Sequence, residues 1–194
     1  LVIVKTEWDG LVPAVQSGKI DAIIAGMSPT AERKESIDFT DVYYTSDLVM
    51  VVKKGGKYEN ATKLSDFKGA TITGQLNTFH YTVIDQIDGV KKDTAMDNFP
   101  AMRVALESGK IDGYVSERPE GVSATSANKN FAMVEFADGQ GFKTSDEDTA
   151  IAVGLKKDSD LKDKINKILA GISEDERKDL MDQAIKDQPA SEDN

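Results

Sequence analysis

One segment of the 194-residue sequence combines residue types that are suited to holding a carboxylate. Gly26 follows a short apolar run and allows a ligand to approach the backbone closely. Ser28 and Thr30 supply hydroxyls at the expected start of a helix, where free N–H groups attract anions. Arg33 lies in the first turn and carries a planar fork that grips a carboxylate. The spacing predicts a carboxylate clamp; the alternative is plain N-capping, with Arg33 solvated or paired to Glu32 or Asp38.

Composition excludes several classes of function. The chain has 34 acidic and 24 basic side chains, and its net charge of −10 argues against binding to nucleic acid. It has no cysteine, which removes disulfides, thiolate metal sites and cysteine nucleophiles. Its single histidine, His80, cannot form a histidine-rich metal site, and we expect it to be structural. No apolar run approaches the roughly 18 residues of a membrane helix, and no phosphate loop or nucleophile elbow is present. We therefore expect neither a metal nor a cofactor.

An internal repeat organises the elements that position this segment. Residues 17–21 (Ser-Gly-Lys-Ile-Asp) recur 91 positions later, at residues 108–112. Each copy predicts a short helix that is capped by an aspartate, Asp9 or Asp97, and closed by the glycine of the repeat. A short apolar run after each copy predicts a buried strand. Such turns also recur by chance in α/β proteins, but the matching flanks favour two α/β lobes of similar build.

The remaining pattern predicts how the lobes are connected. Short strands alternate with helices, which indicates parallel sheets built from βαβ units. A strand near residue 48 leaves the first lobe, and a strand near residue 150 returns to it. We expect residues 1–48 and 150–194 to form lobe one and residues 49–149 to form lobe two. The two crossing strands predict a hinge, with a ligand-binding cleft between the lobes.

The end of the chain is strongly helical in its pattern. Residues 160–186 predict helix with a break before Ser173, which forms a capping box with Glu176. The polar residues 188–194 are expected to fray. The acidic run at residues 145–148 lacks the ligand spacing of a calcium loop, so we expect a solvated charged surface there.

A longer motif surrounds the clamp and carries a family resemblance. The run Met-Ser-Pro-Thr-Ala-Glu-Arg at residues 27–33 continues through Asp-Phe-Thr-Asp at residues 38–41 to Tyr43 and Tyr44. This pattern resembles the polar amino-acid-binding proteins of ABC importers, the extracytoplasmic solute-binding proteins of family 3 type. The resemblance covers nearly the whole chain. It implies a two-lobed, periplasmic-binding-protein-like (type II) α/β fold that captures a polar or basic L-amino acid, of the arginine, lysine, histidine or glutamine type, for delivery to a membrane permease.

The resemblance implies specific roles in the first lobe. In this family the arginine at the Arg33 position binds the α-carboxylate of the ligand. The positions of Gly26 and Ser28 supply a backbone carbonyl and a hydroxyl to the α-ammonium, and Met27 lies in the same predicted site. Trp8 matches an apolar or aromatic position that packs on the ligand side chain; the alternative is a half-buried core tryptophan.

Further roles follow for the second lobe. Glu117 occupies the place of an acidic residue, commonly aspartate, that pairs with the α-ammonium; a salt bridge to Arg118 is the alternative. The loop with Gln75, Asn77 and Thr78 matches a segment whose backbone N–H groups hold the carboxylate. The family usually has glycine where Asn77 stands, and asparagine can adopt positive φ. Gln75 either reaches a polar substrate side chain or stabilises the loop.

Two other functions stay open from the sequence. One is an enzyme of cyclohexadienyl-dehydratase type on the same scaffold, with Glu117 as proton donor. The other is the ligand-binding module of a sensor receptor. Binding is favoured over catalysis because the ammonium-partner pattern is intact and no second catalytic group is evident. The resemblance implies an extracytoplasmic location, either periplasmic or lipid-anchored at the outer face of the cell membrane.

The resemblance also predicts that lobe one is incomplete. The chain opens on Leu1-Val-Ile-Val, without the strand–helix segment that precedes this point in the family. The missing strand would lie between residues 1–4 and residues 22–25, so its loss leaves unpaired backbone edges. We expect lobe one either to rearrange or to associate with a second copy.

Overall fold

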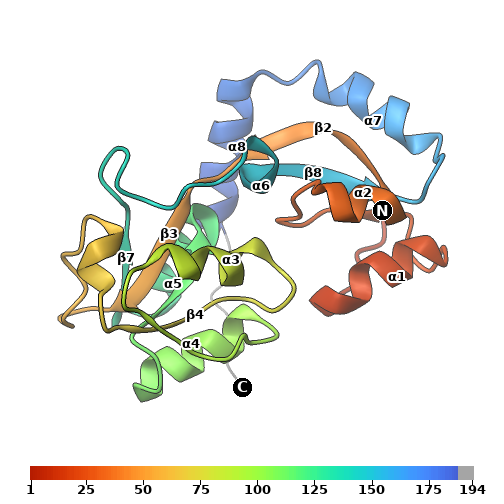
Figure 1. Cartoon of the computed structure of the whole chain (residues 1–194). Helices are drawn as coiled ribbons and strands as arrows, with labels where there is room; N and C mark the ends of the chain where they lie inside the picture. The colour runs from red at the N-terminus through yellow and green to blue at the C-terminus, as the bar shows by residue number, and fades with distance from the viewer. Residues whose placement is uncertain (188–194) are drawn as a thin grey trace. The chain divides into compact units, whose positions relative to one another are not determined.

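The computed structural model describes residues 1–187 and divides into two compact units, whose elements are labelled in Figure 1. The first unit comprises Leu1–Ser46 and Ser145–Gln183. The second comprises Asp47–Thr144, together with the end of the last helix from Ala184. The chain thus passes between the units three times: after Ser46, after Thr144 and, within its last helix, after Gln183. The fraying expected for residues 188–194 concerns residues that lie outside the described part of the chain.

The first unit is built on a three-stranded antiparallel sheet. Strands β1 (Ala22–Ile23) and β2 (Asp38–Thr45) both pair with β8 (Ala150–Leu155), in the order β1-β8-β2. The other elements of this unit are η1 (Trp8–Gly10), α1 (Leu11–Gln16), α2 (Ala31–Ser36), α6 (Asp146–Thr149), α7 (Leu161–Leu169) and most of α8 (Glu174–Asp187).

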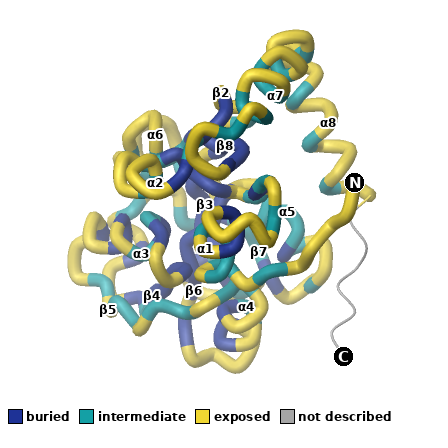
Figure 2. The backbone as a smooth tube through the Cα atoms, turned by 90° about the vertical axis from the view of Figure 1, so that its right-hand side faces the viewer, coloured by how far each residue is buried: buried dark blue, intermediate teal, exposed yellow. Residues whose placement is uncertain are grey.

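Its core is small because the long helices at its edge are mostly polar. Val15, Ile23 and Ile37 form the centre of the core and are at most 2% exposed. In the described part of the chain, α7 and α8 contain no fully buried residue, and Figure 2 shows them in the colours of exposed and intermediate residues. A polar contact helps to attach α7: the Oδ1 of Asn166 accepts a hydrogen bond from the backbone N–H of Asp41 at 2.8 Å.

The second unit is built on a five-stranded mixed sheet in the order β5-β4-β6-β3-β7. Strands β4 and β5 and strands β4 and β6 pair in parallel, whereas β3 pairs antiparallel with β6 and β7. Its elements are β3 (Leu48–Lys53), η2 (Leu64–Phe67), β4 (Thr71–Thr73), α3 (Phe79–Thr82), η3 (Val83–Gln86), β5 (Lys91–Lys92), α4 (Phe99–Ser108), β6 (Gly113–Glu117), α5 (Arg118–Ala127) and β7 (Phe131–Val134).

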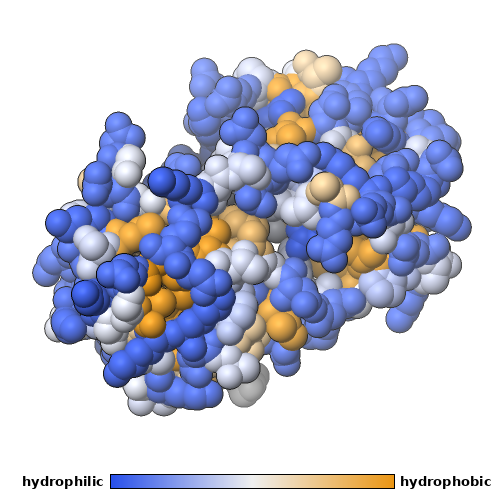
Figure 3. Space-filling model, viewed as in Figure 1, coloured by the Kyte–Doolittle hydropathy of each residue, from blue (hydrophilic) through white to orange (hydrophobic). Residues whose placement is uncertain are grey.

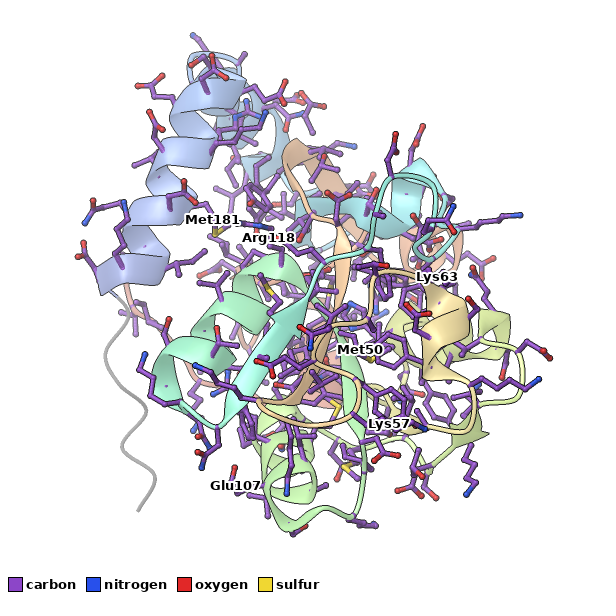
Figure 4. All side chains as sticks on the ribbon, turned by 90° about the vertical axis from the view of Figure 1, so that its left-hand side faces the viewer. Met50, Lys57, Lys63, Glu107, Arg118 and Met181 are labelled. Atoms are coloured by element: carbon purple, nitrogen blue, oxygen red, sulfur yellow. The ribbon has the colours of Figure 1, made fainter. Side chains whose placement is uncertain are left out.

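Apolar residues cover both faces of this sheet. Along β3, Met50 packs into a cluster with Phe67 and Ile84, while its neighbour Val51 packs into a second cluster with residues of α4 and α5. Successive side chains of a strand point to opposite faces, so a continuous apolar run fills both clusters. Figure 4 shows Met50 in the interior of the second unit and the exposed Lys57 at its periphery. The outer surface in Figure 3 is largely hydrophilic with scattered apolar patches.

The prediction of parallel sheets is wrong for the first unit and only partly right for the second. Parallel pairing of successive strands needs a crossover between them. In the first unit β8 returns from the far end of the sequence and enters between β1 and β2, antiparallel to both. In the second unit only the pairs made by β4 are parallel.

The predicted C-terminal ends of the two repeat helices are confirmed, whereas their predicted N-terminal caps are wrong. Gly18 and Gly109 have φ of +74° and +78°, which confirms that each closes its helix. Asp9 is not a cap, because it lies inside η1. Asp97 is one residue too early: Asn98 caps α4, with its Oδ1 accepting from the N–H of Ala101 at 3.0 Å. The break between α7 and α8 and its Ser173–Glu176 capping box are confirmed.

Candidate functional site

The loop between β1 and α2 contains most of the residues predicted to bind ligand in the first unit. Gly26 is exposed, whereas Met27 and Ser28 are each 1% exposed. Met27 packs into the core of this unit. Thr30 caps α2, with its hydroxyl accepting from the N–H of Arg33 at 3.4 Å. The sequence therefore folds this loop with an anchored middle and an exposed backbone at Gly26.

Ser28 is fixed by a long-range hydrogen bond. Its hydroxyl donates to the backbone carbonyl of Asp148 at 2.7 Å. Asp148 belongs to the acidic run that precedes β8. This run forms α6, with a capping box between Ser145 and Asp148. Because the Ser28 hydroxyl is committed as a donor, its lone pairs remain the part that can receive a donor such as an ammonium.

The Arg33 guanidinium is held by two contacts within the first unit. Its Nη1 donates to the carbonyl oxygen of Ser28 at 3.0 Å. Its central carbon lies 5.4 Å from the centre of the Trp8 ring, a cation–π arrangement. Asp38, one of the acids considered as a partner for Arg33, instead contacts Lys157 at 3.1 Å. Together these contacts orient the planar fork of the arginine.

Trp8 takes the structural role that was the alternative to ligand contact, and its contact with a ligand stays a prediction. It is half-buried in η1 and packs against the core of the first unit, as the structural alternative requires. Its ring also faces the guanidinium of Arg33. A rigid aromatic face beside a cation stabilises that cation by about 0.5–1 kcal/mol at exposed sites. The Trp8 ring therefore helps to hold the Arg33 guanidinium in place.

The loop after β4 holds the predicted residues of the second unit. Asn77 has φ of +56°, so the expected positive φ is confirmed. The Thr78 hydroxyl donates to the carbonyl of Gln75 at 2.8 Å, and the Gln75 amide donates to the carbonyl of Asp97 at 3.2 Å. Gln75 and Thr78 are buried, and Asn77 is exposed. These bonds give Gln75 the loop-stabilising role, and they give Asn77 the backbone conformation usual for glycine.

Glu117 ends β6 and is 8% exposed. The alternative that it pairs with Arg118 is wrong, because Arg118, at the start of α5 in Figure 4, binds Glu135 at 2.9 Å. The Oε1 of Glu117 lies 3.6 Å from the Nε2 of His80 and has no hydrogen-bond partner among residues 1–187. An acidic side chain is thus buried in the second unit with its acceptor uncommitted.

His80 is the residue that the sequence reasoning missed. We expected a structural histidine, and it is indeed buried, in α3 between the rings of Phe79 and Phe99. Its proximity to Glu117 has no local signal, because 37 positions separate the two residues. The one available signal was its place just after the predicted binding loop.

Other features of the described chain do not add chemistry to these residues. Residues 1–187 contain no group of three or more histidine, aspartate or glutamate side chains arranged to hold a metal ion. No helix in the same range combines the length and apolar content needed to cross a bilayer. A cavity of about 250 Å³ is lined by residues of β2 and α8, and none of the predicted ligand contacts lines it.

The likeness to known proteins extends over most of the chain. It is 29% identical to an arginine-binding extracellular protein, ArtP, of Bacillus subtilis, over 84% of this chain and 62% of that relative. It is 31% identical to the ABC transporter glutamine-binding protein GlnH of the same organism, over 92% of this chain and 63% of that relative. The chain therefore spans less than two thirds of the length of either protein.

Solved structures give the same picture. An amino acid ABC transporter substrate-binding protein from Streptococcus pneumoniae, bound to L-arginine, superposes with a TM-score of 0.80 at 28% identity. The match covers 95% of this chain and 75% of that structure, which confirms the predicted two-lobed α/β fold class. The model of the bacterial extracellular solute-binding proteins, family 3, matches residues 1–186. The chain therefore belongs to the bacterial extracellular solute-binding proteins of family 3.

Proposed function

We propose that this chain captures a polar or basic L-amino acid outside the cytoplasm and delivers it to the membrane permease of an ABC importer. The observation that carries the proposal is the orientation of Arg33, whose guanidinium is fixed by the Ser28 carbonyl and the Trp8 ring. Relatives named for arginine, histidine and glutamine binding support it. Because this chain spans only part of the length of these relatives, their binding activity is attributed to it as a proposal.

The chemistry of an amino acid matches what the two units offer. A zwitterion needs a cation for its carboxylate and an acceptor for its ammonium. The first unit presents Arg33, which suits bidentate binding of a carboxylate. The second unit presents Glu117, nine-tenths buried, where an ion pair is screened less by water than at the surface. The lone pairs of Ser28 and the backbone of Gly26, Asn77 and Thr78 supply the remaining polar contacts of the proposed site.

Binding rather than catalysis is the function that the relatives support. They are named as binding proteins of transporters, not as enzymes. The alternative of a dehydratase acting through Glu117 is therefore set aside. The family is extracellular by its description, which places the chain outside the cytoplasm. Attachment by a lipid anchor, as opposed to a free periplasmic form, is a further proposal that membrane fractionation of the full-length protein tests.

We also propose that the first unit can associate with a second copy. The side chains of Leu1, Val2 and Ile3 are between 84% and 114% exposed, and β1 lies at the edge of its sheet. Exposed apolar residues and an open strand edge each favour pairing with another chain. Light scattering on this chain should detect dimers that Ile3→Lys abolishes. A monomer at all concentrations would contradict the proposal.

The test of the proposed function is calorimetric titration of arginine, lysine, histidine and glutamine. We expect binding of at least one of them by the unaltered chain. Arg33→Ala should weaken that binding by about 2–5 kcal/mol, because it leaves the ligand carboxylate without its charged partner. Arg33→Lys keeps the charge but loses the fork, and should fall between the two.

Arg118→Ala is the matched control, because Arg118 is a surface arginine paired to Glu135. It should bind as the unaltered chain does. Far-UV circular dichroism reports whether the Arg33 variants keep their fold, because Trp8 fluorescence responds directly to loss of the neighbouring guanidinium. Unchanged affinity in a folded Arg33→Ala variant would remove the clamp, and failure of the unaltered chain to bind any amino acid would remove the function.

A further inference from the structure

His80 and Glu117 form a buried pair in the second unit whose facing atoms lack hydrogen bonds. Their side chains are 5% and 10% exposed. Within residues 1–187, neither ring nitrogen of His80 has a hydrogen-bond partner, and neither has the Oε1 of Glu117. Buried polar atoms in native proteins are nearly always partnered, and each exception needs an explanation, of which a functional role is one. The pair therefore calls for an explanation other than stability.

Close packing holds the imidazole in this place. A Cβ on Gly74 would lie 2.6 Å from the carbonyl oxygen of His80, so the end of β4 contacts the backbone of α3 directly. The ring lies 4.6 Å from the Phe79 ring and 6.3 Å from the Phe99 ring of α4, measured between centres. From β6, the group that faces it is the Glu117 carboxylate. The imidazole is thus enclosed by apolar rings and backbone, with one acid before it.

The distance within the pair allows charge coupling but no hydrogen bond. At 3.6 Å, the separation of His80 Nε2 and Glu117 Oε1 exceeds the 2.7–3.2 Å typical of an N–H···O bond. A neutral imidazole leaves the carboxylate with its full charge and a free acceptor. An imidazolium at the same place neutralises that charge. The protonation state of His80 thus determines what Glu117 offers to a cationic group.

We propose that His80 is a positioning residue for Glu117 and that its cationic form competes with the ligand ammonium for that carboxylate. The inference rests on the proposed function, in which Glu117 receives the α-ammonium. Capture of an amino acid and protonation of His80 then oppose each other. Binding releases a proton at mildly acidic pH, and acidification releases the ligand.

The chain contains a single histidine, so a pH dependence of binding near neutrality can be assigned to one side chain. Histidine is the side chain whose ordinary titration falls between pH 5 and 8, and His80 is the one histidine present. L-Arginine is a suitable probe because its ammonium, guanidinium and carboxylate stay charged from pH 5.5 to 7.5. A pH dependence of its binding in that range therefore points to the protein.

The experiment is calorimetric titration of L-arginine from pH 5.5 to 7.5, in two buffers of different ionisation enthalpy. In the unaltered chain, affinity should fall toward acid pH by up to about tenfold per pH unit, with release of a proton on binding. In His80→Gln the affinity should be independent of pH and no proton should be released. Glu135→Gln, at a surface acid, serves as the control and should keep the slope of the unaltered chain.

An equal pH slope in the unaltered chain and in His80→Gln would overturn the inference while leaving the proposed function intact. Absence of binding of any amino acid by the unaltered chain would overturn the proposed function and this inference with it. Proton NMR provides a readout that needs no variant. The titration curve of the single histidine should move to lower pH when L-arginine saturates the protein, and an unmoved curve would again overturn the inference.

Discussion

A helix ends on a glycine in each unit, and the bonds around the two glycines correspond one for one. The N–H of Lys19 donates to the carbonyl of Ala14 at 2.9 Å, and the second unit repeats this bond 91 positions later at the same length. The hydroxyl of the serine before each glycine donates to that same carbonyl, at 3.1 and 3.0 Å. The same local sequence therefore builds the same helix end in two different surroundings.

The strands that follow these helix ends differ. In the first unit β1 has two residues at the edge of a sheet, and the next residue, Ile24, is 71% exposed. In the second unit β6 has five buried residues between β4 and β3, and Val115, the counterpart of Ile24, is fully buried. Similar local patterns thus end in opposite environments, because neighbouring strands and helices, not the turn, decide burial.

The largest test of this comparison removes side-chain volume at the two counterpart positions. Val115→Ala should lower the free energy of unfolding by about 2–3 kcal/mol, since it deletes buried methyl groups and leaves a cavity. Ile24→Ala should change it by less than about 0.5 kcal/mol because the side chain is exposed. Urea unfolding followed by far-UV circular dichroism measures both. Equal losses would show that the two strands are equally buried in solution.

A second test exchanges glycine and alanine at the first residue of each strand. Gly113 has little room, since a Cβ there would lie 3.0 Å from the carbonyl oxygen of Val51 and 3.3 Å from the side chain of Ile72. Gly113→Ala should therefore destabilise the second unit by about 1–3 kcal/mol. The counterpart is Ala22, where Ala22→Gly should cost about 0.5–1 kcal/mol through backbone entropy. Thermal unfolding compares the two, and a stabilised Gly113→Ala variant would contradict the crowding.

A third test concerns the feature that the two units share. Gly18→Ala and Gly109→Ala should each cost about 1 kcal/mol, because both positions have positive φ and neither has a crowded Cβ site. Chemical denaturation should give nearly equal values. Trp8 fluorescence follows the first unit, and circular dichroism follows the whole chain. Markedly unequal losses would show that the surroundings, and not the local turn, stabilise these helix ends.

The smallest expected effect depends on pH and concerns the first unit, where polar contacts support a small core. The N–H of Asp158 and the Lys157 ammonium hold the pKa of Asp38 below its ordinary value. A lowered folded-state pKa stabilises the protein above the unfolded value of about 3.9 and ceases to do so as pH falls through the folded value.

Asp38→Asn should therefore cost up to about 1 kcal/mol at pH 7, and the difference from the unaltered chain should shrink as pH falls below about 3.9 and vanish once pH is below the lowered pKa of the folded state. Unfolding monitored by Trp8 fluorescence at several pH values measures it. The comparison variant is Asp85→Asn, at an exposed acid of the second unit paired with Lys92, which should leave Trp8 fluorescence unfolding unchanged. A loss in Asp38→Asn that does not shrink as pH falls below about 3.9 would mean that the carboxylate charge is not the cause.

Much of the site was predictable because it depends on short segments. Thr30 caps its helix, Asn77 adopts positive φ, and Ser173 forms its capping box as their neighbours in sequence dictate. The family motif supplied Arg33 and Glu117, whose roles as ligand contacts stay predictions. The caps at Asp9 and Asp97 were wrong by small shifts of register, which a single sequence does not resolve.

The sequence by itself determined where helices end and where strands run, because these features depend on interactions between close neighbours. It also determined which family the chain resembles, because the family motif is a short run of residues. Only the tertiary structure decided that β8 pairs antiparallel with both β1 and β2, that Ser28 donates to Asp148, and that His80 faces Glu117. These contacts join residues 37 to more than 100 positions apart. Their partners are selected by packing of the whole unit, and no local pattern encodes that choice.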